Sequence, residues 1–251
     1  MRGGATLLVV VGGDGSVHEV VNGIAGAEGV DLAVIPRGTG WDFVRTYGIP
    51  RDLDRAVDIA LGGNVREIDA GSVTYRTWAG GEGSARFANV ASAGISGAIA
   101  HRANESSKTL GGKLSYYWAT LAVFVGWQTG EMRVTVDDET RVGRMIDAMV
   151  CNGRYLGGGM MMCPDAEPDD GLFDVLLIGD VTKRDLAFVL PKTYKGKHLP
   201  HPRLELLRGS TVTVDAEEPL PIELDGEQPG TTPVRFEIRP RALRLRVPAS
   251  S

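Results

Sequence analysis

The alternation of apolar and polar positions divides the chain into two parts. Up to about residue 63, apolar runs alternate with segments of helical spacing. TLLVVV and DLAVIP have the short, β-branched character of buried strands, and VHEVVNGIA, residues 41–47 and RDLDRAVDIALGG have the pattern of helices. Strands that alternate with helices predict a parallel α/β layer.

Beyond residue 63 the pattern changes to short alternating segments, with helical stretches expected only at about 115–127 and 183–194. These segments are RFANVASAG, MRVTVDD, DAMVCNG, LFDVLLIG, TVTVDA, LPIELDG, VRFEIRP and LRLRVP. Such alternation is typical of an antiparallel sandwich or barrel. We therefore predict an α/β domain over residues 1–63 and a larger, mostly antiparallel β-sandwich domain over 64–251, whose last strand could pack back on the first domain.

Composition narrows the functional classes. The chain has 251 residues and a formal net charge of −5, without a dense basic run, which argues against nucleic acid as a partner. Its two cysteines, Cys151 and Cys163, lack the spacing of a zinc site or disulfide framework and fit a reducing cytoplasm. The apolar window YYWATLAVFVGW is too short to span a bilayer. We expect a soluble cytoplasmic protein that could touch a membrane surface.

The stretch GGDGS, residues 12–16, follows the first predicted strand and precedes a predicted helix. Ser16 and Glu19 have the spacing of a capping box at the start of that helix. Glycines before a helix N-terminus let backbone N–H groups approach a phosphate, so the stretch predicts an anion-binding loop. A hairpin turn at Asp14 and Gly15 is the alternative, but a helical pattern and not a strand follows.

A second loop, PRGTGWDFVR, lies in the equivalent place after the second predicted strand. Gly38, Thr39 and Gly40 leave its backbone unobstructed, and Asp42 follows. Loops at the carboxyl ends of neighbouring parallel strands converge on one crevice, where open α/β sheets bind ligands. Alternatively, Thr39 only caps the short helix and Asp42 only interacts favourably with its N-terminus.

The two loops together carry a family resemblance. GGDGSVHEVVNG followed by LAVIPRGTGWDFVR resembles the nucleotide-binding core of the diacylglycerol kinase catalytic family, bacterial lipid kinases related to sphingosine kinases. The hallmark of that family is GGDG[TS] followed by P-x-GT-x-N-D-F-A-R. In the same order, GGKLSYYW, GGGMMMCPDAEPDDGLFDVLLI and IELDGE resemble its later motifs, so the match covers nearly the whole chain.

The resemblance implies a lipid kinase with its active site in the cleft between two domains. It implies ATP as phosphate donor, Mg²⁺, and a hydroxyl of diacylglycerol, a sphingoid base or phosphatidylglycerol as acceptor at a membrane surface. The implied ATP-binding residues are Gly12, Gly13, Gly15, Ser16, Glu19, Gly38, Thr39 and Gly40.

Carboxylates supply the implied chemistry. By the resemblance, Glu227 is the first candidate for general base with Asp225 beside it, and Asp14 is a rival base or a metal-linked phosphate positioner. Without the resemblance, an exposed hairpin turn is the alternative for LDGE.

By the same resemblance, the acidic stretch DAEPDDGLFD implies a structural magnesium site, and clustered carboxylates and turn carbonyls are ligands that a hard cation prefers. Its predicted ligands are the side chain of Asp170 and the main-chain oxygens of Glu167 and Leu172, and Asp42 is a further candidate metal ligand. A solvated acidic loop is the alternative for this stretch.

The chain departs from the family pattern in two ways. The family domain normally begins several tens of residues earlier with an N-P-x-[SA]-G loop, so we expect a sheet with an exposed edge that could favour a homodimer. Trp41 also stands where asparagine is usual. Two other functions therefore remain open, an NAD kinase-like phosphotransferase and a non-catalytic nucleotide- or lipid-binding remnant.

Overall fold

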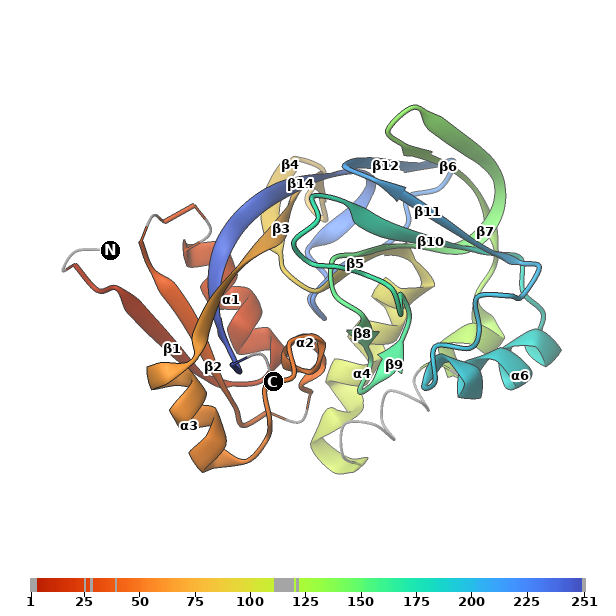
Figure 1. The fold of residues 1–251 in the computed structure, drawn as a ribbon. Helices are drawn as coiled ribbons and strands as arrows, with labels where there is room; N and C mark the ends of the chain where they lie inside the picture. The colour runs from red at the N-terminus through yellow and green to blue at the C-terminus, as the bar shows by residue number, and fades with distance from the viewer. Residues whose placement is uncertain are drawn as a thin grey trace.

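The computed structural model describes residues 4–24, 26–27, 29–38, 40–110, 120 and 122–249, without the side chains of 103–110. Within these residues, twelve strands join in one sheet and β8 and β9 form a separate hairpin (Figure 1). The strands are β1 (Leu7–Gly12), β2 (Asp31–Pro36), β3 (Asn64–Thr77), β4 (Glu82–Phe87), β5 (Val90–Gly94), β6 (Gly130–Val136), β7 (Glu139–Cys151), β8 (Tyr155–Leu156), β9 (Met160–Met161), β10 (Phe173–Gly179), β11 (Leu204–Gly209), β12 (Thr211–Ala216), β13 (Ile222–Leu224) and β14 (Gly230–Val247). The helices are α1 (Asp14–Ile24), α2 (Asp42–Thr46), α3 (Leu53–Gly62), α4 (Ile95–Leu110) and α6 (Lys183–Thr193).

The N-terminal part is the predicted α/β layer. β1 and β2 are parallel, and the end of β14 continues this layer by pairing in parallel with β2 at Leu245 and Leu32. Because α1 carries Val17 and Val21 on one face, it packs on the strands in a common apolar cluster that includes Leu32 and Leu245. The carboxyl ends of β1 and β2 therefore lie together at the start of α1 and α2.

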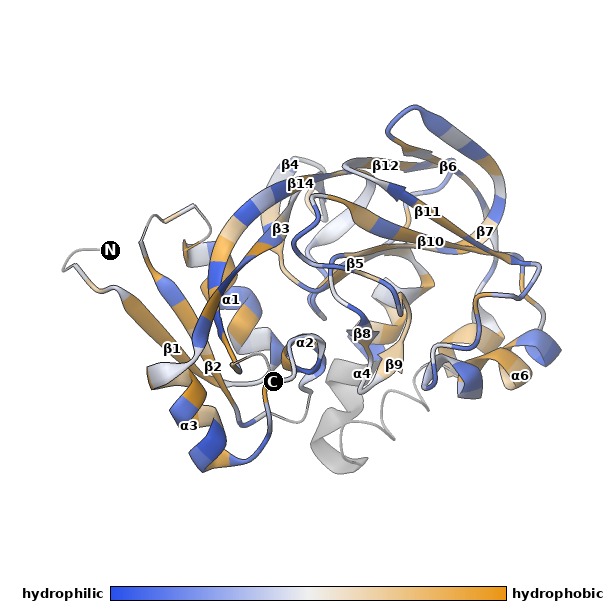
Figure 2. Cartoon of the chain, viewed as in Figure 1, coloured by the Kyte–Doolittle hydropathy of each residue, from blue (hydrophilic) through white to orange (hydrophobic). Residues whose placement is uncertain are grey.

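The larger part is built from antiparallel pairs, as the alternating segments predict. Its core contains alternate residues of β6, β7, β10, β12 and β14, and Phe87 stacks on Phe173 with their ring centroids 5.6 Å apart. The predicted fold class, an α/β part followed by a sandwich-like β part, is thus confirmed. Figure 2 shows hydrophobic residues along β1, β2 and β10, and mixed hydrophobic and hydrophilic residues along α6.

A long antiparallel ribbon of β3 and β14 runs through both parts (Figure 1). The register of β14 shifts between Arg239 and Leu243, where Arg241 has a φ of 52°. The buried carboxylate of Asp69 accepts the N–H of Arg241 at 2.8 Å and the N–H of Gly171 at 2.7 Å. Asp69 therefore fixes the bulge and ties it to the acidic loop at 165–172.

Several predicted elements need correction. The capping box is wrong, because α1 begins at Asp14 and the N–H of Val17 donates to the oxygen of Gly13, so that Ser16 and Glu19 lie inside the helix. α4 was not predicted, since few apolar residues recur after Ile99 and Ala100. VRFEIRP and LRLRVP form one strand, β14. The helix predicted at 183–194 is confirmed, but 115–127 lies largely outside the described residues.

Among the helices of the described part of the chain, none combines the length and hydrophobicity that crossing a bilayer requires.

The pairing of β2 with β14 rests on an ion pair that can be tested. Asp31 is buried, and its two carboxylate oxygens accept Arg244 Nε at 2.8 Å and Arg246 Nη2 at 2.7 Å. Asp31→Asn should lower the free energy of unfolding by about 1–2 kcal/mol, because the arginines lose their charged partner but keep partial contact with water. Urea denaturation measures the change.

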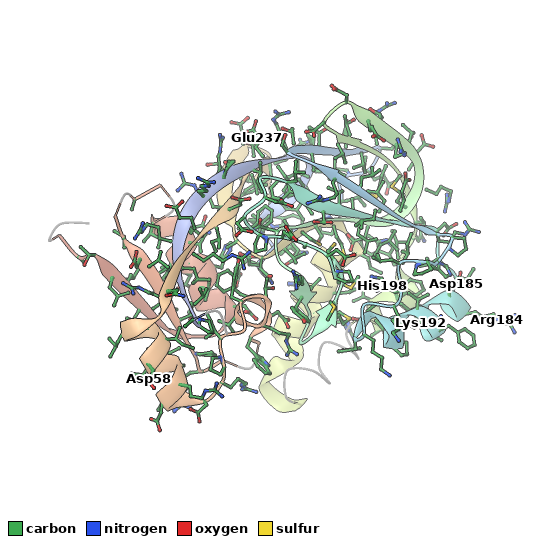
Figure 3. All side chains as sticks on the ribbon, in the orientation of Figure 1. Asp58, Arg184, Asp185, Lys192, His198 and Glu237 are labelled. Carbon is green, nitrogen blue, oxygen red and sulfur yellow. The ribbon has the colours of Figure 1, made fainter. Side chains whose placement is uncertain are left out.

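The control is Asp58→Asn, which removes an exposed carboxylate of α3 (Figure 3). It should leave the unfolding free energy within about 0.5 kcal/mol of wild type. Equal stability of the two variants would show that the ion pair does not hold the strands together.

Candidate functional site

The two glycine loops touch each other at the carboxyl ends of β1 and β2. A Cβ atom on Gly38 would lie 2.4 Å from the Cα of Gly13, and one on Gly13 would lie 3.1 Å from the Cα of Gly38. These distances are shorter than any ordinary contact, so the backbones approach this closely only because neither residue has a side chain. The predicted convergence of the loops is therefore present.

Asp14 links the loops at the first turn of α1. Its carboxylate accepts the N–H of Asp42 at 3.2 Å and the N–H of Phe43 at 3.1 Å, which are the first amides of α2. Burial and the nearby Asp42 raise the pKa of Asp14 from 3.8 to about 6, against the lowering effect of the two N–H groups. A Cβ on Gly40 would lie 2.5 Å from Asp14 Oδ2, so this loop also needs glycine at 40.

The remaining predicted phosphate-binding residues lie along α1 or beside it. Gly15 and Ser16 are exposed in the first turn, Glu19 is exposed one turn further on, and Gly12 ends β1. Thr39 lies outside the described residues. The exposed start of α1, with its N–H groups and no bulky side chain at Gly15, can receive an anion.

The stretch LDGE forms a tight hairpin turn between β13 and the segment before β14. Asp225 and Gly226 have φ angles of 51° and 97°, and the main chains of Leu224 and Glu227 bond to each other in both directions. Positive φ at both central residues is what a type I′ turn requires. The turn buries one acidic side chain, that of Asp225, and leaves the other, that of Glu227, exposed.

Asp225 is fully engaged in holding this turn in place. Its carboxylate accepts the N–H groups of Ala88, Asn89 and Val90 at 2.9 to 3.1 Å, and it lies 3.3 Å from His18 Nδ1. Asp225 therefore holds the turn, and Glu227 is the exposed carboxylate of the two.

His18 of α1 also contacts the site, through Asp225. Burial lowers its pKa, but the hydrogen bond and charge of Asp225, with the charges of Glu227 and Glu19, raise it above 6.5 overall. The signal in the sequence was the spacing, since His18 follows Asp14 by four residues and so lies on the same face of α1. Asn22, four residues later, pairs with the main chain of Arg86 in β4.

Two cations lie against Trp41, namely Arg45 of the short helix α2 and Arg51 from the segment before α3. The guanidinium carbons of Arg45 and Arg51 lie 4.3 Å and 4.8 Å from the centre of a Trp41 ring. The N–H of Gly158 donates to Asp42 Oδ2 at 2.6 Å, so the hairpin of β8 and β9 is fixed to α2. The position of Trp41 beside the second glycine loop is thus stabilised by cation–π contacts.

The predicted magnesium site at 165–172 has a different set of partners. The carboxylate of Asp170 forms an ion pair with Arg208 and accepts the N–H of Leu172 at 3.0 Å, while its own N–H donates to the oxygen of Glu167. No group of three potential metal ligands occurs in the described residues. Because the guanidinium of Arg208 occupies its carboxylate, Asp170 is not arranged here to bind a Mg²⁺ ion. The assignment of residues 165–172 as a magnesium site stays a prediction.

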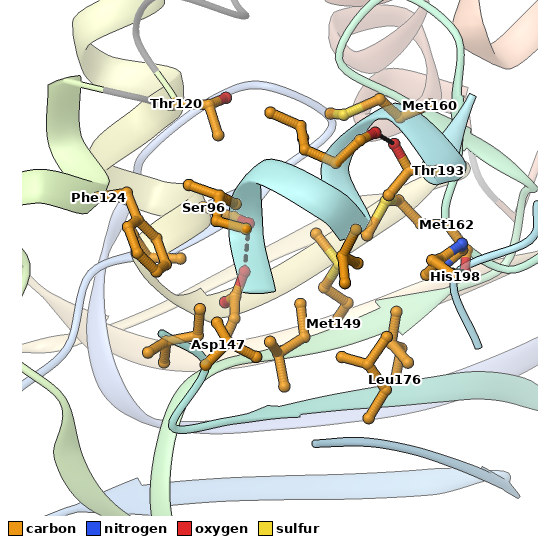
Figure 4. Close-up of a pocket in the computed structure, with 18 of the residues that line it drawn as sticks. Ser96, Thr120, Phe124, Asp147, Met149, Met160, Met162, Leu176, Thr193 and His198 are labelled. Atoms are coloured by element: carbon orange, nitrogen blue, oxygen red, sulfur yellow. Dashed lines mark hydrogen bonds between the residues drawn. The ribbon is translucent and has the colours of Figure 1, made fainter. Parts of the chain in front are cut away.

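An apolar pocket lies beside the site, between α4, α6 and one face of the sheet (Figure 4). It offers about 720 Å³ of space free of protein atoms, including its open mouth, and its wall contains Leu156 and Met160 from the β8–β9 hairpin. Ser96 and Asp147 lie in the same wall, where the hydroxyl of Ser96 donates to Asp147 Oδ2. The hairpin that contacts α2 thus also borders the pocket.

Two family models match the chain. The model of the diacylglycerol kinase catalytic domain matches residues 1–73, and that of the YegS C-terminal NAD kinase beta sandwich-like domain matches residues 89–247. The two matches cover the α/β part and most of the β part.

Individual proteins agree with these models. The diacylglycerol kinase of Bacillus subtilis strain 168 is 29% identical over 92% of this chain and 74% of its own length. The "Probable lipid kinase YegS-like" of Pseudomonas aeruginosa strain PAO1 is 32% identical over 100% of this chain and 80% of its own length. A solved structure from Bacillus anthracis str. Sterne, described as a "putative diacylglycerol kinase", has a TM-score of 0.76 at 26% identity over 96% of this chain and 78% of its own.

The contact between the glycine loops gives the first prediction of the site. Gly38→Ala should lower the free energy of unfolding by about 1–3 kcal/mol, because the loops must separate to admit the methyl group. Gly23→Ala is the control, since a Cβ there meets no atom within 4 Å and alanine stabilises a helix by up to about 1 kcal/mol. Urea denaturation of both variants tests this; equal stabilities would contradict the close approach.

Asp147 gives a pH dependence of stability. Burial raises its pKa from 3.8 to about 7, against the lowering effect of Ser96 and the neighbouring N–H groups. Between these values the folded state retains a proton that the unfolded state has lost, so this group's contribution to stability falls as the pH rises from about 4 to about 7. The fall amounts to at most about 4 kcal/mol.

The measurement compares wild type with Asp147→Asn by urea denaturation at several pH values. The variant cannot titrate at this position, so it should gain stability relative to wild type as the pH rises through this range. A constant difference would show that the carboxyl titrates normally. Asp54→Asn, which changes an exposed carboxylate of α3, should show no such trend.

Proposed function

Since the chain belongs to the family of diacylglycerol kinases and YegS-like lipid kinases, we propose that it transfers the terminal phosphate of ATP to a hydroxyl of a lipid. Enzymes of this family are phosphotransferases with an alcohol group as acceptor, and diacylglycerol is the acceptor that the names of several relatives give. A sphingoid base or phosphatidylglycerol would present the same chemical group.

The contact between the two glycine loops carries the proposal. The loops of Gly13 and Gly38 meet beside the start of α1, so main-chain N–H groups and the helix terminus can receive the phosphates of ATP without a lysine-bearing Walker loop. Phosphoryl transfer depends mostly on such positioning and on charge stabilisation.

Glu227 is the proposed general base. Its exposed carboxylate can accept the proton of the lipid hydroxyl while the oxygen bonds to the γ-phosphorus and the bond from that phosphorus to ADP breaks. Asp225 is the positioning residue in this proposal, because its carboxylate is occupied by main-chain N–H groups and His18.

Asp14 and Asp42 are the proposed holders of a Mg²⁺ ion that arrives with ATP. The two carboxylates repel each other enough to contribute to the raised pKa of Asp14, and a bound divalent cation would relieve that repulsion. When bound, the ion would neutralise charge on the phosphates.

The apolar pocket is the proposed site for the hydrocarbon part of the lipid. Its wall is mostly Ile, Leu, Met and Val side chains, and the hairpin of Leu156 and Met160 places one side of it next to α2. A nucleotide such as NAD offers no hydrocarbon chain to fill such a pocket, which favours the lipid over the NAD kinase-like alternative.

The proposal places the enzyme at a membrane surface during catalysis. Phe188, on α6, is 73% exposed, and five exposed cations lie on α6 or in the segment that follows it. They are Lys183, Arg184, Lys192, Lys195 and Lys197. Figure 3 shows Arg184 extending outward from α6. An apolar residue with basic neighbours suits the surface of an anionic bilayer.

Association into a homodimer through β1 is a further part of the proposal. Among the described strands β1 lies at one end of the sheet, and its residues Val9 and Val11 are 39% and 63% exposed. An exposed edge strand with apolar side chains can pair with a second copy.

A transfer assay with γ-labelled ATP tests the activity on a panel of lipid micelles and on NAD. Wild type should label a lipid, and Glu227→Gln should lower kcat by about 100-fold to 10,000-fold, because the amide cannot take the proton. Glu218→Gln, an exposed acid in the segment before β13, is the matched control and should act as wild type.

The other outcomes separate the alternatives. Label on NAD and on no lipid would establish the NAD kinase-like function. Absence of transfer to any acceptor, with ATP still binding, would establish a non-catalytic remnant.

A further inference from the structure

A buried carboxyl group, that of Asp147, interrupts the hydrocarbon wall of the lipid pocket. Asp147 projects from β7 into the pocket beside Ser96 of α4, and its side chain is completely buried (Figure 4). The surrounding wall residues on this side are Ile95, Ile99, Phe124, Ile146 and Met149. A carboxyl group in such surroundings is costly unless it is hydrogen-bonded.

Only one oxygen of Asp147 is paired within the described part of the chain. The Ser96 hydroxyl donates to Oδ2, whereas Oδ1 is buried without a hydrogen-bond partner among those residues. A ligand that fills the pocket with hydrocarbon alone would leave Oδ1 without a donor. A ligand with a hydroxyl at this depth would supply the donor.

Asp147 lies too far from Glu227 for one hydroxyl group of the lipid to meet both residues. β7 pairs with β5 so that Cys151 lies opposite Val90, whose N–H is held by Asp225 in the turn before Glu227. Asp147 is four residues earlier on β7, which is roughly 13 Å along the strand from that end. The group that meets Asp147 is therefore a second polar group, carried on the hydrocarbon chain.

We propose that this kinase prefers acceptor lipids that carry a hydroxyl group within the hydrocarbon chain, which Asp147 and Ser96 recognise at the pocket wall. The inference rests on the proposed lipid kinase function and names its substrate class. Asp147 is a specificity-determining residue here, since it touches the chain and not the reacting atoms.

The chemistry of the wall favours a neutral hydroxyl over an ammonium group. Burial raises the pKa of Asp147 to about 7, so the carboxyl gains a proton easily and can either donate to or accept from a hydroxyl. An ammonium group would bring a full charge and three donors into a wall that is mostly hydrocarbon.

The test uses diacylglycerols of equal chain length that differ only in one chain hydroxyl, moved along the chain from lipid to lipid. Wild type should show a higher kcat/KM, by about 10-fold or more, for the lipid whose hydroxyl reaches Asp147. Asp147→Leu should lose this preference and convert the plain lipid at least as well, because an apolar wall no longer leaves an oxygen unpaired. Asp147→Asn keeps an oxygen at this position and should retain part of the preference.

Controls keep the outcome unambiguous. Asp58→Leu removes an exposed acid of α3 in the same way and should leave the preference unchanged. Equal conversion of plain and hydroxylated lipids by wild type, an undiminished preference in Asp147→Leu, or a stronger preference for a chain amine would overturn the inference.

Equilibrium displacement of a fluorescent fatty acid by the same lipids separates the two proposals. Tighter binding of a hydroxylated lipid to wild type, lost in Asp147→Leu, would support the polar contact even if no lipid were phosphorylated. Labelling of lipids without this difference in binding would leave the kinase proposal intact and overturn the inference about the chain hydroxyl.

Discussion

The carboxylate of Asp225 is the interaction on which the site depends. It gathers the N–H groups of residues 88–90, contacts His18 on α1, and sits in a turn with positive φ at two successive residues. One side chain thereby joins the first helix, the start of β5 and the turn before β14. Removing a buried acceptor of this kind would leave several main-chain donors unsatisfied, and Glu227 would lose its fixed position beside α1.

The parts of the fold that sequence could predict are those with strong local signals. The β1 loop and α1 were recognisable because glycines separate a β-branched run from a helical pattern, and Thr182 with Asp185 marks the start of α6 through a true capping box. The box assigned to Ser16 was wrong for a tertiary reason. Asp14 already receives the amides of α2, and α1 begins at Asp14, three residues earlier than the local pattern indicated.

From the sequence, the site could be predicted only as three separate loops, without their contacts. Sequence placed Gly13, Gly38 and Glu227 in three loops but could not show that the first two touch, because that contact depends on the register of β1 and β2. It also could not distinguish the roles of Asp225 and Glu227, which differ in burial and not in residue type. No sequence pattern indicated a role for Asp147, because that role depends on the apolar residues that α4 and β10 place around it.

The ribbon of β3 and β14 has a mechanical consequence. A kinase cleft usually closes by relative movement of its two sides, and hinges are commonly a few residues in a connecting loop. Here two hydrogen-bonded strands, β3 and β14, connect the two sides of the cleft. A pair of hydrogen-bonded strands resists bending more than a single connecting loop does. The bulge at Arg239 to Leu243, clamped by Asp69, is the one interruption of this ladder near the crossing, and it concentrates any flexure there. The acidic loop at 165–172 is hydrogen-bonded to the same carboxylate, so it would move together with the bulge.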